Sequence, residues 1–271
     1  MNDDLPPTEQ RHPQSGHLAD LDAAGVVELM NQEEYRVLRA VEQAAPAIAR
    51  VAQRVASGFL NGGRTIFIGA GTSGRIALQE AAELPPTFGV SAESFTVLAA
   101  GSSAMGPSII ARTEDDVESV PRVLAAMGIG PADVLIGVTA SGRTPFVMSG
   151  IQAAAGAGAW TCAISNNPDS PVFQGASERM LLDTGPEILT GSTRLKAGTA
   201  QKLVLNRITT AAMVLAGRVV SNHMVDLSGS NQKFRARSVR IVMDLAHVDA
   251  DSARRILEDA EWSVRRALNR T

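Results

Sequence analysis

Five short apolar runs, bounded by polar or glycine-rich residues, recur in the middle of the chain. They lie near residues 65–69, 95–99, 133–139, 160–165 and 179–183, and segments of helical length separate most of them. Continuous apolar runs indicate strands that are buried on both faces, as in a parallel sheet covered by helices. The pattern therefore predicts an α/β fold with a central five-stranded, mainly parallel sheet flanked by helices.

Helical periodicity dominates both sides of this region. Apolar residues recur every three or four positions in residues 21–31 and again in 33–60, which predicts two N-terminal helices. Residues 197–220 are predicted to form one long buried helix, and a tail from about 231 to 270 is predicted to form a small helical bundle.

These elements suggest a division of the chain into three parts. Residues 1–18 are polar and contain proline, so we expect an extended N-terminal arm. We expect residues 19–225 to form the main domain together with its N-terminal helices. Residues 226–271 would then be a C-terminal helical segment.

Composition disfavours several classes of partner. The 271 residues are 45% hydrophobic and 20% charged, and the formal net charge of −3 offers no general attraction to nucleic acids or anionic membranes. The single cysteine, Cys162, lies in an apolar run, so no intramolecular disulfide can form. Neither a secretory signal nor a membrane-spanning apolar run is recognisable. We expect a cytoplasmic protein that binds neither nucleic acid nor membrane.

The turn after the first predicted strand supplies the first candidate binding residues. These are Gly71, Thr72, Ser73 and Gly74. A helix start offers unpaired N–H groups and a positive dipole end to an anion, and glycine lets the backbone come close. The spacing Gly69-x-Gly71-x-x-Gly74 also matches the dinucleotide fingerprint. However, Glu93 precedes the next strand instead of ending it, which disfavours a nucleotide.

The same design recurs after the third predicted strand. Its candidate binding residues are Ser141, Gly142, Arg143 and Thr144. Pro145 follows, as is typical of the first turn of a helix. Because the carboxyl ends of neighbouring parallel strands converge on one crevice, both turns can surround a single phosphate. The alternative is two ordinary turns whose hydroxyls only cap helices.

A third candidate, residues 185–202, combines hydroxyls, glycines and two of the chain's three lysines ahead of an apolar segment. A compact ammonium suits a phosphate or a developing oxyanion. We therefore expect Ser192 and Lys196 to contribute to an anion site, the alternative being a helix start with solvated lysines. Lys202 stands six residues further on and points to another face, where it would serve structure or a dimer contact.

In their order along the chain, these segments resemble the N-acetylmuramic acid 6-phosphate etherases of the sugar isomerase (SIS) domain superfamily. The matching segments are Thr8-Glu9-Gln10-Arg11, GAGTSGR at 69–75, ELPPTFG at 83–89, EDD at 114–116, ASGRTP at 140–145, GSTRLKAGTAQK at 191–202 and MVD at 224–226. The resemblance implies a three-layer SIS-type fold and a homodimer without metal or cofactor. It also implies cleavage of the lactyl ether of N-acetylmuramic acid 6-phosphate, giving N-acetylglucosamine 6-phosphate and D-lactate.

The resemblance assigns roles to particular side chains. Glu83 matches the acid that protonates the departing ether oxygen, and Glu114 matches the base that removes the C2 proton of the open-chain sugar. The side chains that would hold the 6-phosphate are Thr72, Ser73, Ser141 and Thr144. Lys196 would supply positive charge near the sugar, in a site near the subunit interface.

The chemistry is consistent with these roles. A lactyl ether at C3 lies β to the C1 aldehyde and can leave once a base removes the acidified C2 proton. The apolar sequence neighbours of Glu83 are consistent with the raised pKa that an acid working near neutrality requires. The alternative is an ordinary solvated carboxylate, at a helix end for Glu83 and in a first helical turn for Glu114.

The chain departs from the family's usual pattern beside both glutamates. Ala82 and Leu84 stand where the family has Ser and Cys, residues 111–113 replace a Glu-Gly-Ala, and the glycine pair after the second strand is altered at 100–103. Three alternatives follow. The protein would act on a different phosphosugar, sense a phosphosugar without catalysis as the related glucokinase regulatory protein does, or isomerise an aldose to a ketose.

Overall fold

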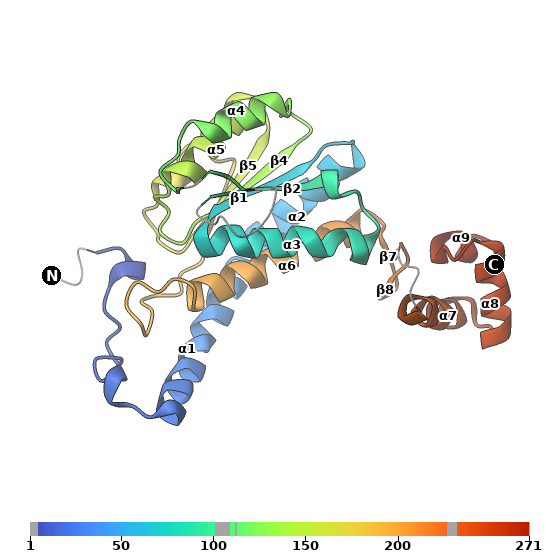
Figure 1. Cartoon of the computed structure of the whole chain (residues 1–271), viewed down its shortest axis with the longest axis horizontal. Coiled ribbons are helices and arrows are strands. Elements are labelled where there is room, and N and C mark those ends of the chain that lie inside the picture. The colour runs from blue at the N-terminus through green and yellow to red at the C-terminus, as the bar shows by residue number, and fades with distance from the viewer. Residues whose placement is uncertain (1–4, 101–108, 112, 227–231, 271) are drawn as a thin grey trace.

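The structure is a computed structural model that describes residues 5–100, 109–111, 113–226 and 232–270 (Figure 1). Its helices are α1 (Ala23–Gln43), α2 (Ala45–Leu60), α3 (Gly71–Phe88), α4 (Ser119–Ala126), α5 (Pro145–Gly156), α6 (Lys196–Leu215), α7 (Gln232–Ala246), α8 (Ala250–Asp259) and α9 (Val264–Leu268). Its strands are β1 (Thr65–Ala70), β2 (Phe95–Ala100), β3 (Ile109–Ala111), β4 (Val134–Val138), β5 (Trp160–Ser165), β6 (Glu178–Leu181), β7 (Val219–Val220) and β8 (His223–Met224). Short 3-10 helices are η1 (Pro7–Glu9), η2 (Leu18–Asp20), η3 (Ala92–Ser94) and η4 (Pro171–Phe173).

A parallel sheet in the order β3-β2-β1-β4-β5-β6 forms the centre of the fold. In its middle, Thr65 of β1 lies opposite Phe95 of β2 on one side and Val134 of β4 on the other. Five of these strands match the predicted ones, so the α/β class is confirmed. The sixth strand, β3, was not predicted, because a three-residue edge strand is too short to produce an apolar run.

Helices cover both faces of the sheet. Ile66 and Ile68 of β1 pack with α4 and α5, whereas Phe67 between them packs with α2, α3 and α6. All three side chains are fully buried, and such burial contributes about 1.5–3 kcal/mol for each large apolar side chain. The result is the three-layer arrangement in Figure 1, with α4 and α5 on one side of the sheet and α3 and α6 on the other.

Two predicted helix boundaries were wrong. α1 continues through residue 32 and ends at Gln43, and α2 then begins with Pro46 in its first turn. Proline disfavours a helical residue before it and lacks an N–H, so it separates two helices at this point. The helix predicted over 197–220 ends at Leu215, because Gly217 takes a left-handed backbone and the chain turns into the β7–β8 hairpin.

The C-terminal helices α7, α8 and α9 form an apolar cluster of their own, which also includes Val225. They lie to one side of the sheet (Figure 1). Arg265 of α9 links them to the preceding chain, because its Nη2 is 2.6 Å from Asp226 Oδ2. The predicted helical tail is confirmed, while the domain boundary at residue 225 stays a prediction. Within the described part of the chain, no helix is both long enough and apolar enough to cross a membrane.

We expect two glycines with the same backbone angle to differ in their tolerance of a side chain. Gly89 and Gly128 both have φ of +61°, but a Cβ on Gly89 would lie 2.2 Å from the carbonyl oxygen of Asp226, whereas a Cβ on Gly128 would meet nothing within 4 Å. Gly128→Ala should lower the free energy of unfolding by about 1 kcal/mol, the cost of a left-handed residue. Gly89→Ala should lower it by about 2–4 kcal/mol, because the backbone must also shift. Urea denaturation measures both changes, and equal losses would contradict the assigned contact.

Candidate functional site

The two predicted binding turns lie side by side at the carboxyl edge of the sheet. β1 and β4 are neighbours with Gly69 opposite Val138, and each strand leads directly into its turn. In an open α/β sheet this edge is where ligands bind. The structure therefore brings the turns at 71–74 and 139–144 together.

The first turn is tighter than the sequence predicted, because α3 begins at Gly71 and not near Ile76. Thr72, Ser73 and Gly74 consequently form the first turn of the helix. A Cβ on Gly74 would lie 2.8 Å from the carbonyl oxygen of Gly69, so the helix can start this close to the strand only with glycine there. Thr72 is half-buried and Ser73 is buried. The helix start presents amide groups to an anion at the sheet edge.

The second turn is held by a small network of hydroxyls. Thr139 Oγ1 lies 2.8 Å from Thr144 Oγ1 and 3.3 Å from Ser141 Oγ, and it accepts the N–H of Gly142 at 3.2 Å. Ser141 Oγ also accepts the N–H of Arg143 at 3.2 Å. Thr144 is buried ahead of α5, while Ser141 is half-buried and Arg143 exposed. The hydroxyls of this turn therefore fix its shape, and Ser141 and Arg143 are the members that reach solvent.

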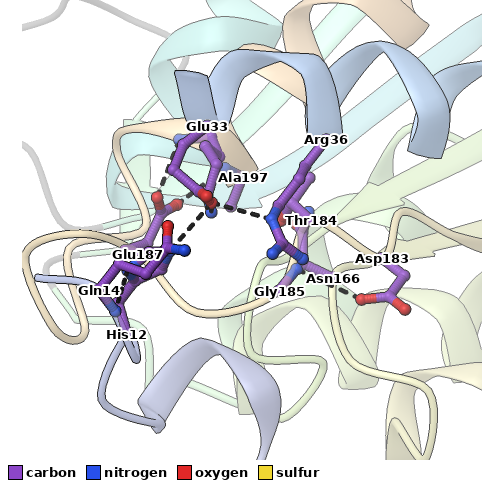
Figure 2. A network of polar contacts seen from close by, with 11 residues as sticks. His12, Gln14, Glu33, Arg36, Asn166, Asp183, Thr184, Gly185, Glu187 and Ala197 are labelled. Atoms are coloured by element: carbon purple, nitrogen blue, oxygen red, sulfur yellow. Dashed lines mark hydrogen bonds and ion pairs between the residues drawn. The ribbon is translucent and has the colours of Figure 1, made fainter. Parts of the chain in front are cut away.

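Lys196 does not reach the sheet edge as a free ammonium. It is the first residue of α6, only 3% exposed, and its Nζ donates to Glu33 Oε2 on α1. The same carboxylate oxygen lies 3.1 Å from His12 Nε2 and 3.0 Å from Arg36 Nε. Figure 2 shows His12 and Arg36 converging on Glu33 from different segments. Burial alone would raise the pKa of Glu33, but Lys196 and His12 lower it below its ordinary value.

The start of α6 is capped by a carboxylate of the protein itself. Glu187 is 1% exposed and accepts the N–H of Lys196 at 3.1 Å and that of Ala197 at 2.9 Å. Burial raises the pKa of Glu187, although these two amides and the nearby Lys196 act in the opposite direction. The helix start that was predicted to bind an external anion thus binds a carboxyl group of the protein itself. Ser192 is half-buried in the turn before α6, and its N–H donates to the carbonyl oxygen of Leu189.

A buried chain of hydrogen bonds that the sequence analysis missed connects the turn at 71–74 to α6 and to the residues that follow β5 and β6. Ser73 Oγ donates to Gln201 Oε1 at 2.8 Å, and Gln201 Nε2 donates to Asn166 Oδ1 at 3.0 Å. Asn166 Nδ2 then donates to the carbonyl oxygen of Leu182 at 2.9 Å. Gln201 lies within the motif at 191–202 and Asn166 directly follows β5, so both could be recognised in the sequence as candidate polar residues. Their pairing could not be predicted, because it depends on tertiary structure.

The N-terminal arm also joins this region, which the sequence analysis did not predict. Thr8 and His12 are buried. The N–H of Thr8 donates to Asn167 Oδ1 at 3.1 Å, and Asn167 Nδ2 donates to Thr8 Oγ1 at 2.9 Å. Asn167 also reaches the second turn, because its Nδ2 lies 3.1 Å from the carbonyl oxygen of Ser141. The arm is therefore docked on the main body beside a binding turn.

The two glutamates expected to be catalytic lie apart. Glu114 is exposed, and its carbonyl oxygen accepts the N–H of Phe146 at 2.9 Å, which places it against the start of α5 beside the second turn. Glu83 lies on α3 twelve residues beyond Gly71, which at 1.5 Å per residue is about 18 Å along the helix. Ala81 and Leu84 point into the core, while Glu83 points outward and is exposed. The apolar setting suggested by its sequence neighbours is therefore not observed, and the exposed position matches the alternative of a solvated glutamate.

The buried carboxyl of α3 is Glu80, one turn before Glu83. Glu80 is 3% exposed and lies 2.8 Å from Lys202 Nζ, 2.7 Å from Asn206 Nδ2 and 2.6 Å from Thr209 Oγ1. Lys202 therefore joins α6 to α3, in keeping with the structural role considered for it. Among the residues that the structure describes, no group of three or more His, Cys, Asp or Glu side chains is placed to hold a metal ion.

Family models and solved structures agree on the fold. Residues 47–155 match the glucokinase regulatory protein N-terminal SIS domain, and residues 108–211 match the SIS domain. A phosphoheptose isomerase from Francisella tularensis superposes with a TM-score of 0.53 at 17% identity, covering 71% of this chain and 98% of the other. The NanR protein of Vibrio vulnificus, solved with ManNAc-6P, superposes with a TM-score of 0.50 at 16% identity, covering 74% of this chain and 67% of that protein. The expected SIS-type fold is confirmed.

Curated relatives extend the likeness over nearly the whole sequence. An N-acetylmuramic acid 6-phosphate etherase from Actinobacillus pleuropneumoniae is 43% identical over 261 residues, which are 96% of this chain and 86% of the relative. One from Geobacillus thermodenitrificans is 41% identical over 96% of this chain and 88% of its own length. At this identity and coverage, the chain belongs to the N-acetylmuramic acid 6-phosphate etherase family.

Proposed function

We propose that the protein is a carbon–oxygen lyase that cleaves the lactyl ether of N-acetylmuramic acid 6-phosphate, releasing D-lactate and leaving N-acetylglucosamine 6-phosphate. The observation that carries the proposal is the identity of about 40–43% to etherases over 96% of the chain. The position of the two binding turns at one edge of the sheet supports it. A solved SIS-fold protein bound to ManNAc-6P supports a phosphosugar as the ligand.

The turns suit the phosphate end of this substrate. The start of α3 offers N–H groups and the Thr72 hydroxyl, and the second turn offers Ser141 and the exposed Arg143. A phosphate anchored there would hold the sugar in one position, with its C2 proton within reach of a base. Glu114, beside the second turn, is the group that we assign to the C2 proton. The ether oxygen then leaves as Glu83 protonates it, and water adds to the double bond.

The distance between the two glutamates supports a homodimer. Glu114 lies with the turns at the carboxyl edge of the sheet, whereas Glu83 lies about 18 Å along α3 from that edge. One chain cannot place both carboxyls on the same sugar carbons. In a symmetric dimer, an exposed Glu83 can reach the partner's turns, which completes two equivalent sites. A cytoplasmic location, expected from the sequence, stays a prediction.

Lys196 is proposed to act indirectly, by fixing the start of α6 against the turn at 71–74. Its ammonium is buried against Glu33, and the neighbouring Gly198 is so close to the first turn that a Cβ there would lie 3.4 Å from Thr72 Cγ2. The ion pair therefore fixes the start of α6, and the start of α6 in turn packs against the phosphate turn. Among the described residues, Glu33 is the partner of this ammonium.

The first test is the release of D-lactate from N-acetylmuramic acid 6-phosphate. We expect turnover by the unchanged protein and a loss of about 10²–10⁴-fold in kcat for Glu83→Gln and for Glu114→Gln, because each removes one positioned proton transfer. Glu93→Gln, which changes an exposed glutamate on η3, is the matched control and should keep full activity. Substrate binding without lactate release by the unchanged protein would favour a sensor, and C2 proton exchange without lactate release would favour an isomerase.

Mixing the two inactive variants tests the shared site. If each site uses Glu83 of one subunit and Glu114 of the other, a mixed dimer contains one intact site and one that lacks both carboxyls. Random mixing should then restore about a quarter of the unchanged activity in a twofold-symmetric dimer. Refolding or prolonged incubation of the two variants together, followed by the lactate assay, measures this recovery. Activity that stays at the level of the separate variants would show that both glutamates act within one chain.

The Lys196 ion pair predicts a pH-dependent stability. At about pH 7, Glu33→Gln should lower the free energy of unfolding by about 3–5 kcal/mol, because it leaves a buried ammonium without its partner. The pKa of Glu33 is lowered in the folded protein, so its contribution is present above the unfolded value and is lost as pH falls through the folded one. The difference should therefore shrink below about pH 4.

Denaturation of both proteins at about pH 7 and about pH 3.5 measures this difference. Glu28→Gln, at an exposed position on the same helix, is the control and should cost less than about 0.5 kcal/mol at either pH. A penalty for Glu33→Gln that is as small as this control would contradict the assigned ion pair.

A further inference from the structure

We infer that the N-terminal arm, residues 5–14, forms a wall of the binding site, and that the pocket between this arm and the second turn holds a small oxyanion. The inference rests on the proposed function and deepens it. The pocket has a volume of about 320 Å³, within the range of sites that hold small ligands. Leu5, Pro7 and Gln10 line it from the arm, and Ser141, Arg143 and Asn167 line it from the turns after β4 and β5.

Two buried contacts make the arm a fixed wall. On one side of Gln10, Thr8 exchanges two hydrogen bonds with Asn167. On the other side, His12 Nε2 lies 3.1 Å from Glu33 Oε2, and the side chains of both residues are nearly inaccessible to solvent. The residues between these two anchors therefore have little freedom to leave the pocket. Buried hydrogen bonds and a buried polar contact to a carboxylate are costly to break without replacement.

The chemistry of the pocket suits an anion. Arg143 is exposed, and within the described residues its guanidinium forms no ion pair. Guanidinium groups bind carboxylates and phosphates through paired N–H groups. Asp169 also lines the pocket, but no ion pair joins it to Arg143. The positive charge of Arg143 is therefore free to attract an oxyanion that enters between the turn and the arm.

The arm also extends toward the third candidate segment, residues 185–202. A Cβ on Gly191 would lie 3.6 Å from Glu9 Oε2, so Glu9 faces the turn before α6 while Gln10 faces the second turn. The arm thus spans the space between the two turns. The proposed substrate carries two oxyanions, namely the 6-phosphate of the sugar and the carboxylate of the lactyl group. The pocket holds one of them.

Changing the charge at position 10 tests the pocket. Gln10→Glu should weaken binding of the anion that occupies it by about fivefold or more, and Gln10→Lys should strengthen it by a similar factor, because a charge beside the anion acts directly on it. Gln14→Glu, at an exposed position of the same arm outside the pocket, is the matched control and should have no effect. The Gln10 amide donates only a surface hydrogen bond to the Leu5 carbonyl oxygen, so these variants should fold.

Titrations of each variant with inorganic phosphate and with D-lactate, followed by calorimetry or NMR, distinguish the 6-phosphate from the lactyl carboxylate as the bound anion. A response of phosphate binding alone assigns the 6-phosphate to the pocket, and a response of D-lactate binding alone assigns the lactyl carboxylate. If neither anion responds to either substitution at position 10, the inference is overturned. The proposed function is tested separately. Charge-dependent anion binding without lactate release would reject the etherase and keep the pocket, whereas turnover with an unchanged KM in both variants would reject the pocket and keep the etherase.

Discussion

Parallel pairing of the central strands is the constraint on which the rest of this structure depends. Because each neighbouring pair runs in the same direction, the strands leave the sheet at the same edge, and the chain must cross back to the other edge before the next strand begins. After β1 and β4 it does so through α3 and α5. The turns after β1 and β4 are therefore adjacent although about 70 residues separate them in sequence. Both faces of the sheet are then occupied by helices, so the carboxyl edge is where a polar ligand can reach the backbone.

Much of the charge on and around α6 is neutralised within the protein. Glu33 binds the ammonium of Lys196, Glu187 accepts the first amides of α6, and Glu80 binds Lys202. These contacts explain how a motif rich in lysine and glycine can serve mainly to fasten helices. The amides at the start of α3 face no such internal carboxylate among the described contacts, which is why we propose this helix start as the place where a substrate phosphate binds.

The sequence predicted the features that depend on local pattern, and it failed where tertiary contacts decide. Apolar runs located five strands, and glycine with hydroxyls located both binding turns, because strand burial and tight turns restrict the residues that can occupy them. The pairing of Ser73 with Gln201, or of Thr8 with Asn167, leaves no periodic signal, since the partners are more than a hundred residues apart. Lys196 shows the limit most clearly. Its residue type suggested a ligand contact, but a carboxylate on a distant helix determines where its charge goes.

Helix geometry finally decides what a single chain can do with its two glutamates. α3 starts at the turn at 71–74, where we propose that the phosphate binds, and runs away from it, so each further residue of the helix lies further from that turn. Glu83 is exposed on that helix, while Glu114 stays beside the second turn because its backbone is bonded to the start of α5. A reaction that needs both carboxyls within a few ångströms of one sugar therefore requires a second surface opposite the carboxyl edge. In this fold the docked N-terminal arm lies beside the second turn at that edge, and we propose that a second copy of the chain supplies the opposite side.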